Sequence, residues 1–289
     1  MRRANIIEKD TMDISTVESL TSVFESIAST HVAKVKNKVD LSREFFQLLW
    51  KRYSSIQINP DLLVTNRNQG DGDESRKVFV IISAEAGLSG DIDRRLIETM
   101  LQDYDDKTTD IIVLGTHGAN QLTQLGISFT HYFQVPETDR YIDVGPVVDA
   151  ILPYSQVLVY YEEYISLGVQ DIQIIDLISR MRDMSQNVNS DEYTMTDQDT
   201  IFEPSLSDIA EQMEITMMTL ALSQTILESS LAQAASRFSA MAVAKKRASD
   251  MLIDYRLEYY RSKRGESDHR LREVMVGLKK KRLHSGETR

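Results

Sequence analysis

Two glycine-containing turns hold the residues whose types and spacing come nearest to a binding site. The first, Gly87-Leu88-Ser89-Gly90, follows an apolar run and precedes a helical pattern, which is where phosphate-binding loops are found. It lacks the Gly-Lys-Ser/Thr ending of a P-loop and the Gly-x-Gly-x-x-Gly spacing of a dinucleotide-binding fold. We therefore interpret it as a structural turn. The second turn, Gly115-Thr116-His117-Gly118, comes directly after the next apolar run.

The titratable residues form no recognisable catalytic or metal-binding pattern. Glu162 and Glu163 could act as a pair of acids, but no histidine or lysine partner is in sequence reach, so we expect a solvated sheet edge. The chain has no cysteine, and its histidines lack metal-ligand spacing to one another or to nearby carboxylates: His31, His117, His131, His269 and His284. The sequence therefore predicts no catalytic residue, no metal site and no bound cofactor.

Charge is distributed unevenly along the 289 residues. The formal net charge is −11, whereas residues 237–289 carry 15 Lys/Arg and 7 Asp/Glu, a net of +8, so the remainder carries −11 − 8 = −19. Such a segment is either a solvated helix face with a basic tail or a basic rod presented to an acidic surface. Nucleic-acid binding is disfavoured, because the body is acidic and shows no aromatic-basic binding module. Apolar runs are too short for a membrane span or a signal peptide.

Both ends of the chain predict long helices. Residues 1–12 are expected to be a loose leader, followed by a helix over residues 13–64 that has Asp13 as its N-cap and could break near residues 40–42. Its apolar residues recur mostly every three or four positions: Ile14, Val17, Leu20, Val23, Phe24, Ile27, Val35 and Val39. A second helix is expected over residues 205–280, and residues 281–289 are expected to form a basic tail.

The middle of the chain has a different periodicity. After a polar linker over residues 65–77, short apolar runs at 78–82, 111–114 and 156–161 predict buried strands. Helical patterns at 92–102 and 144–152 alternate with them, and residues 185–200 read as an acidic loop or hairpin. This alternation predicts a Rossmann-like α/β domain with a small parallel sheet over residues 78–204.

The C-terminal helix needs a partner because of its length. Residues 205–264 contain neither proline nor glycine and would span roughly 90 Å at about 1.5 Å per residue, which exceeds the diameter of a compact chain of this size. A heptad seam runs along the helix: Leu220, Leu227, Leu231, Ala234, Phe238, Met241, Ala248, Leu252, Tyr255 and Tyr259. Lys245 is a polar member of this seam. We expect an antiparallel coiled coil with the N-terminal helix, and little apolar surface shared with the middle.

Taken together, these features resemble the γ subunit of F-type ATP synthases over most of the chain. The family carries a stretch like Glu-Ser-x-x-Ser-Glu-x-x-Ala-Arg-Met-x-Ala-Met, and the residues shared with it are Glu228, Ser229, Arg237, Ala240 and Met241. Its turn motifs are similar to this chain at Gly87, Leu88, Gly90, Gly115, Gly118, Glu203 and Pro204. Three lysines of the family's N-terminal helix are replaced by Ser22, Glu25 and His31, so the chain resembles a divergent member.

The resemblance implies a non-catalytic rotor shaft that turns inside a ring of α and β subunits. The α/β domain would be the foot that contacts the c-ring and the ε subunit, and protons or sodium ions would drive rotation. The contacts with α and β would include the motif residues above and the basic residues Lys245, Lys246, Arg247 and Arg256. The implied location is peripheral, at the cytoplasmic face of a bacterial-type membrane, with association only through the complex.

Two other functions remain open from the sequence. The turn at 115–118 is also similar to the nucleotide loop of universal stress proteins. In that family, a Gly-Ser or Gly-Thr pair is expected about ten residues beyond the position of Gly118. Ser128 stands there, but Phe129 follows it. A nucleotide-binding domain with coiled-coil arms is therefore one alternative, and a coiled-coil scaffold that self-associates through the heptad seam is the other.

Overall fold

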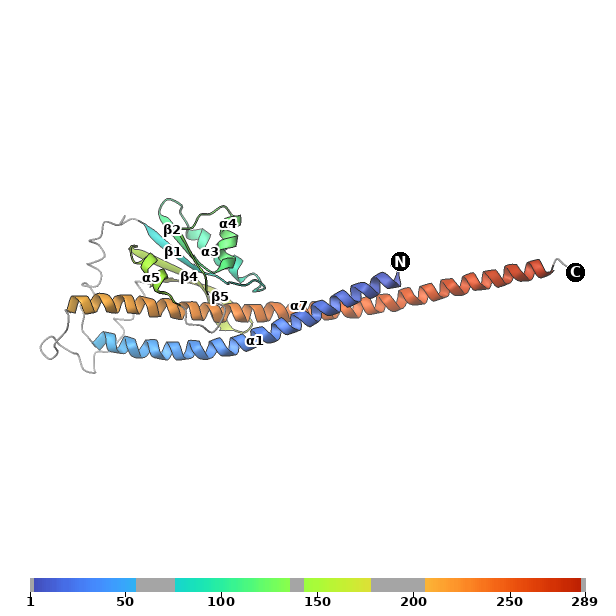
Figure 1. Cartoon of the computed structure of the whole chain (residues 1–289), viewed down its shortest axis with the longest axis horizontal. Helices are drawn as coiled ribbons and strands as arrows, with labels where there is room; N and C mark the ends of the chain where they lie inside the picture. Colours follow the sequence, from blue (N-terminus) through green and yellow to red (C-terminus); the bar gives the residue numbers. More distant parts are fainter. Residues whose placement is uncertain (1–2, 56–75, 136–142, 178–205, 287–289) are drawn as a thin grey trace. The chain divides into compact units, whose positions relative to one another are not determined.

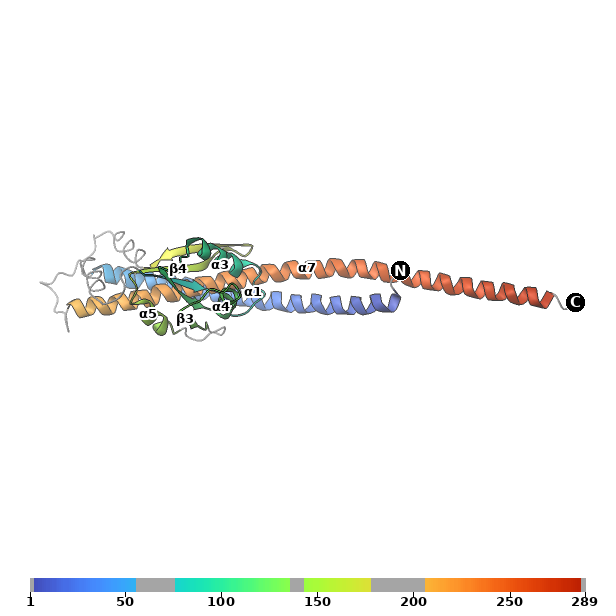
Figure 2. The same cartoon turned by 90° about the horizontal axis from the view of Figure 1, so that it is seen from above.

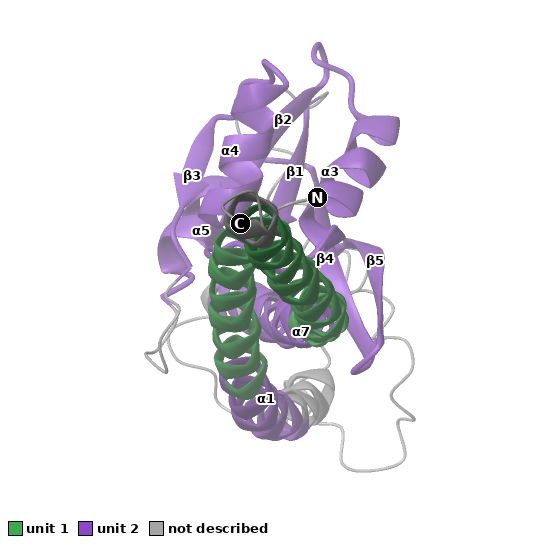
Figure 3. Cartoon of the chain, turned by 90° about the vertical axis from the view of Figure 1, so that its right-hand side faces the viewer, with its two compact units in different colours: residues 1–26, 241–289 green, residues 27–240 purple. Residues whose placement is uncertain are grey.

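The computed structural model describes residues 3–55, 76–135, 143–177 and 206–286 (Figure 1). In chain order, the elements are α1 (Ala4–Ser55), β1 (Lys77–Ile82), α3 (Ile92–Asp103), β2 (Thr109–Leu114), α4 (Thr116–Gln124), β3 (His131–Phe133), α5 (Gly145–Ile151), β4 (Gln156–Ser166), β5 (Val169–Asp176) and α7 (Leu206–Gly286). They form two compact units (Figure 3). Unit 1 consists of Met1–Ser26 and Met241–Arg289, and unit 2 of Ile27–Ala240.

Unit 1 pairs the first part of α1 with the second part of α7. Lys245 Nζ donates to Glu25 Oε2 at 2.8 Å, and the backbone N–H of Ala4 donates to Glu266 Oε1 at 3.1 Å. The residue nearer the start of α1 thus pairs with the residue nearer the end of α7, so the two segments are antiparallel. Between them, the α7 side chains of Met241, Ala248, Leu252 and Ser262 are buried.

Unit 2 contains a five-stranded sheet of order β3-β2-β1-β4-β5. The strands β3, β2, β1 and β4 are parallel, as the strand–helix alternation predicts, and β5 pairs antiparallel with β4. Neither β3 nor β5 was expected. The strand β3 has only 3 residues, and β5 returns from β4 through a tight turn at Gly168, a signal that the sequence does contain.

Each face of the sheet is covered by different helices. On one face, Phe79, Ile81 and Val113 pack with Leu96 of α3 and Leu122 of α4. On the other face, strand residues pack with α5 and with three buried residues of α7, namely Met218, Leu222 and Ile226. In both views of unit 2, α7 lies along this second face (Figures 1 and 2). The expectation that the terminal helices share little apolar surface with the middle is wrong.

In unit 2, α7 also contacts α1. Val32, Val35 and Val39 of α1 form a buried cluster with Leu231, Ala234 and Ala235 of α7. Along the whole of α7, the predicted heptad positions are buried or half-buried, from Leu220 to Tyr259. Within unit 2, α7 is thus covered on one side by the sheet and on another by α1.

In the first half of α1, the buried face differs from the face that its apolar residues predict, although Val35 and Val39 are buried as expected. Val17, Leu20 and Ile27 are 50 %, 52 % and 58 % exposed, whereas Thr21 and Ala28 are buried. The buried positions still follow a heptad, but two of them, Thr21 and Ala28, carry short side chains, which let paired helices approach closely. Both the buried set with Thr21 and Ala28 and the more apolar set with Val17, Leu20 and Ile27 repeat every seven residues. The repeat alone therefore does not decide which set is buried.

The helix ends also differ from the expected boundaries. The helix α1 begins at Ala4, nine residues before Asp13, because Ala4 and Ile7 are buried in unit 1 and extend the seam into the expected leader. It continues without a break through residues 40–42. The helix α7 runs to Gly286, into the expected basic tail, and tolerates Gly265 and Gly277, since one glycine costs only about 1 kcal/mol in a helix. The loop predicted at 185–200 lies outside the described residues.

The packing of α7 on the sheet can be tested by truncating Leu222, which is fully buried. Leu222→Ala should lower the free energy of unfolding by about 2–5 kcal/mol, since it leaves a cavity between α7 and the strands. Chemical denaturation measures this change. Leu257→Ala is the control, because Leu257 is 51 % exposed on the same helix and its truncation should cost less than about 0.5 kcal/mol. Equal losses would contradict the observed packing.

Candidate functional site

The turn at residues 83–90 is the place where the sheet, α4 and α7 come together. It follows the carboxyl end of β1, and both Leu88 (φ 69°) and Gly90 (φ 75°) have left-handed backbone conformations. The α7 side chains hold its backbone: Arg237 donates from Nη2 to the carbonyl of Ala86 at 2.8 Å and from Nε to that of Gly87 at 3.2 Å. Ser236 Oγ donates to the carbonyl of Ser89 at 2.6 Å.

The second glycine turn is shaped by close contact with Ser83. A Cβ on Gly115, whose φ is 99°, would lie 2.1 Å from the carbonyl oxygen of Ser83, and a Cβ on Gly118 would lie 2.5 Å from Ser83 Oγ. The same hydroxyl donates to the carbonyl of Leu114 at 2.9 Å and accepts from the N–H of Gly118 at 2.9 Å. Both glycines are therefore needed for α4 to begin against the end of β1.

The first turn of α4 is not arranged as a nucleotide loop. A phosphate at a helix N-terminus is bound by free backbone N–H groups. Here the N–H of Thr116 donates to Glu85 Oε2 at 3.2 Å, that of His117 to the carbonyl of Ala84 at 2.9 Å, and that of Gly118 to Ser83. The donors that would bind phosphate are satisfied by the protein itself, so the geometry does not support the universal-stress-like alternative.

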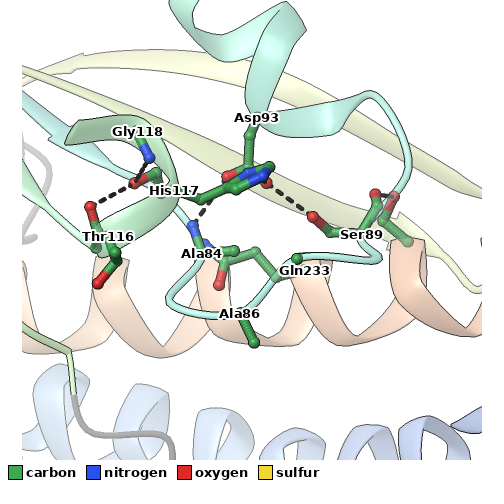
Figure 4. A network of polar contacts seen from close by, with 12 residues as sticks. Ala84, Ala86, Ser89, Asp93, Thr116, His117, Gly118 and Gln233 are labelled. Carbon is green, nitrogen blue, oxygen red and sulfur yellow. Dashed lines mark hydrogen bonds and ion pairs between the residues drawn. The ribbon is translucent and has the colours of Figure 1, made fainter. Parts of the chain in front are cut away.

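Asp93 connects the two turns from the first turn of α3 (Figure 4). Its buried carboxylate accepts from the N–H of Ala84 at 2.8 Å and from Ser89 Oγ at 2.7 Å, and it lies 2.9 Å from His117 Nδ1. Serine, histidine and aspartate are present together, but Ser89 donates to the aspartate rather than to the histidine. A triad requires the histidine to accept the serine proton, so this network holds structure and does not activate a nucleophile.

Glu162 is buried, and the expectation of a solvated edge at 162–163 is wrong for this residue. Its side chain is 0 % exposed, whereas Glu163 is partly exposed. Burial raises the pKa of Glu162 well above its ordinary value, and the nearby charge of Asp93 raises it further. Sequence reasoning missed Ser83 and Asp93 as site residues, and it set Glu162 aside as part of a solvated edge. A serine directly after a buried strand and an acid at the start of a helix were the available signals.

The motif residues of α7 lie on both sides of the boundary between the units. In unit 2, Ser229 is buried and its Oγ donates to the carbonyl of Ile82 at 3.4 Å, while Glu228 accepts from Gln224 at 3.3 Å. Ala240 lies 3.8 Å from the position of a Cβ on Gly90. The stretch that matches the family motif therefore fits α7 to the 83–90 turn.

In unit 1, Met241 is buried, and Lys245 forms the ion pair with Glu25. Glu25 stands where the resemblance leads one to expect a lysine, so this part of α1 offers a negative charge to α7. Lys246, Arg247 and Arg256 are exposed. Glu203 and Pro204 lie outside the described residues.

The described residues offer no constellation for metal chemistry: within them, no three His, Asp or Glu side chains gather as a metal site would require. Among the helices of the described ranges, none is long and apolar enough to cross a membrane.

A family model described as ATP synthase matches residues 5–279, which include both long helices and the sheet. The chain belongs to the ATP synthase family. The prediction from the turn and helix motifs is thus confirmed. Its relatives include the ATP synthase gamma chain of Clostridium beijerinckii, 21 % identical over 278 residues, which covers 94 % of this chain and 95 % of the relative. The gamma chain of Pelagibacter ubique is 21 % identical over 294 residues and covers 94 % and 97 %. This ATP synthase chain is a divergent gamma-type member.

Solved structures have the same fold. A chain of the Euglena gracilis mitochondrial ATP synthase, from a structure of OSCP, F1 and c-ring, aligns with a TM-score of 0.69 at 12 % identity and covers 99 % of this chain and 97 % of its own. A chain of the Tetrahymena thermophila central stalk and c-ring aligns with a TM-score of 0.56 at 14 % identity, covering 78 % and 99 %. The predicted fold, an α/β domain with paired N- and C-terminal helices, is confirmed.

The glycine contacts predict a graded loss of stability. Gly115→Ala should lower the free energy of unfolding by about 3 kcal/mol or more, because it combines a left-handed backbone with a Cβ that overlaps Ser83. Gly126→Ala is the matched control: its φ is 73° but nothing lies within 4 Å, so only the backbone cost of about 1–2 kcal/mol applies. Denaturation curves of the two variants should differ, and coincident curves would refute the close contact.

Proposed function

We propose that this chain is the gamma subunit and central rotor shaft of an F1Fo ATP synthase. The observation that carries the proposal is the family match over residues 5–279, which spans the helix pair and the sheet domain together. The chain couples rotation of an ion-driven c-ring to ATP synthesis or hydrolysis at the α and β subunits, and has no catalytic residue of its own. Its partners are the α3β3 ring, the ε subunit and the c-ring.

The paired helices act by contact. A shaft can change a β subunit only if it binds the open, tight and loose conformations with different affinity. An asymmetric helix pair presents different side chains in each direction, so rotation changes which β subunit is stabilised in which state. Among the expected contact residues, Lys246, Arg247 and Arg256 are exposed and available for acidic partner loops.

Other motif residues support this role from inside the chain. Arg237 and Ser229 bind backbone carbonyls at the carboxyl edge of the sheet, and Ala240 lies beside Gly90. These contacts fasten α7 to the α/β domain, so that a turning force on the domain reaches the helix. Lys245 is engaged with Glu25 and stabilises the helix pair.

The proposed location is peripheral, on the cytoplasmic face of a bacterial membrane. The gamma chains of Clostridium beijerinckii and Pelagibacter ubique, both bacterial, support this location. Attachment to the membrane would run through the c-ring.

Reconstitution tests the function directly. The purified chain alone should show no ATP hydrolysis, and it should co-purify with α and β subunits and raise their ATP turnover. Coupled-enzyme ATPase assays and subunit bands after affinity purification measure both results. ATPase activity of the isolated chain, or failure to bind α and β subunits, would refute the rotor function.

Charge reversal separates partner contacts from internal ones. Replacing Lys246, Arg247 and Arg256 together by glutamate should lower the stimulated turnover roughly fivefold, on the scale of about 1 kcal/mol for exposed ion pairs, with unchanged thermal stability. The effect should shrink as salt is raised, because exposed charges are screened. Lys107→Glu, an exposed change in the α/β domain, is the control and should leave turnover of the α3β3 complex unchanged. Unaltered turnover in the triple variant would remove these residues from the contact.

A further inference from the structure

Glu162 is a buried acid that the rotor function does not use. It lies on β4, beyond the part of this strand that pairs with β1, and its side chain is 0 % exposed. Within the described part of the chain, neither of its carboxyl oxygens has a hydrogen-bond partner. Buried polar groups in proteins are nearly always hydrogen-bonded, so an acid in this state calls for a physical explanation.

The groups that surround Glu162 come from α3 and α7. Asp93 and Arg95 approach from α3, and Ser229 and Gln233 from α7. Both α7 side chains also have other partners: Ser229 Oγ donates to the carbonyl of Ile82 at 3.4 Å, and Gln233 Nε2 donates one N–H to Ser229 Oγ at 3.1 Å. Their interaction with Glu162 lowers its pKa, but by less than burial and Asp93 raise it. Arg95 Nη2 lies 3.5 Å from Asp171 Oδ1 of β5.

The neighbouring carboxylate is fixed in place. Asp93 accepts from Ala84 and Ser89 and lies 2.9 Å from His117, so it cannot turn away from Glu162 at low cost. An ionised Glu162 would therefore be a desolvated charge near a second acid, with Arg95, Ser229 and Gln233 offsetting the cost only in part. A neutral Glu162 avoids this cost and fits the buried site between α3 and α7.

We propose that Glu162 is a proton-linked clamp: its protonated form lets α7 pack against β4 and α3, and its ionised form, a desolvated charge beside Asp93, loosens that packing. The clamp is a property of the isolated chain. Its consequence for a rotor, a pH-dependent stiffness of the joint between the α/β domain and α7, rests on the proposed function.

The sign of the pH effect follows from linkage. The pKa of Glu162 is raised in the folded state above the ordinary value of 4.5, mainly by burial and then by Asp93. Between these two pKa values the folded chain holds a proton that the unfolded chain has lost, so stability falls as pH rises through this window. Within it, the unfolding equilibrium constant should grow by up to about tenfold per pH unit.

The first test compares Glu162→Gln with Glu163→Gln in the full chain. Glutamine keeps the shape of glutamic acid and removes its titration. Glu163 is the matched control, because it is the next residue on β4 and side chains alternate between the faces of a strand. Unfolding by urea is measured from pH 4.5 upward. The unfolding equilibrium constant of the wild type and of Glu163→Gln should grow as pH rises. That of Glu162→Gln should grow by up to about tenfold less per pH unit. Parallel curves for all three chains would overturn the clamp.

A second test needs only the wild-type chain and therefore stands even if a variant fails to fold. With carbon-13-labelled glutamate, infrared spectroscopy should show a protonated carboxyl band that persists to higher pH than the bands of the exposed glutamates. Hydrogen exchange of the amides at 229–236 should increase, beyond the intrinsic rate, as this band disappears. A missing band, or exchange that does not follow it, would overturn the proposal. Because no partner subunit is present, either result is independent of the rotor function.

Discussion

The seating of α7 on the second face of the sheet is the contact on which the rest of unit 2 depends. Without it, the strand residues around Val80 and Ile112 would lack part of their apolar cover, and the 83–90 turn would lose the groups that hold it. The same helix also receives α1 through Val32, Val35 and Val39. One element thus completes two cores, which explains why its motif residues are buried or half-buried rather than fully exposed.

The position of Arg237 illustrates this double use of α7. From the sequence, it reads as a positive charge for an acidic partner. In the structure, its guanidinium donates to the carbonyls of Ala86 and Gly87, in the middle of a strand-to-helix turn that has two left-handed residues. Such a turn leaves carbonyls without partners in the backbone ladder, and the planar guanidinium of arginine satisfies two of them together. The proposed contacts with partner subunits therefore rest on exposed charges of unit 1, namely Lys246, Arg247 and Arg256.

Much of the fold could be predicted from local patterns. Buried runs such as 78–82 identified the central strands, and the absence of proline and glycine identified both long helices. The first glycine turn was placed correctly between its strand and helix, and interpreting it as structural agrees with its contacts to Ser236 and Arg237. The second was expected only to end its strand, whereas Thr116, His117 and Gly118 begin α4. The sequence analysis missed α4, the short strand β3, the returning strand β5 and the α7–sheet contact. The α7–sheet contact depends on partners distant in the sequence, whereas the hairpin from β4 to β5 has a local signal at Gly168.

The sequence by itself determined the two long helices, the parallel strands and membership of the ATP synthase family, because periodicity and turn residues act over a few neighbouring positions. Only the tertiary structure decided which of two heptad phases of α1 is buried, since Val17 and Leu20 compete with Thr21 and Ala28 and the choice depends on how closely α7 approaches. The tertiary structure also decided that Glu162 is buried. An acid beside Glu163 looks solvated until α3, β4 and α7 close around it, and the desolvation then favours the proton.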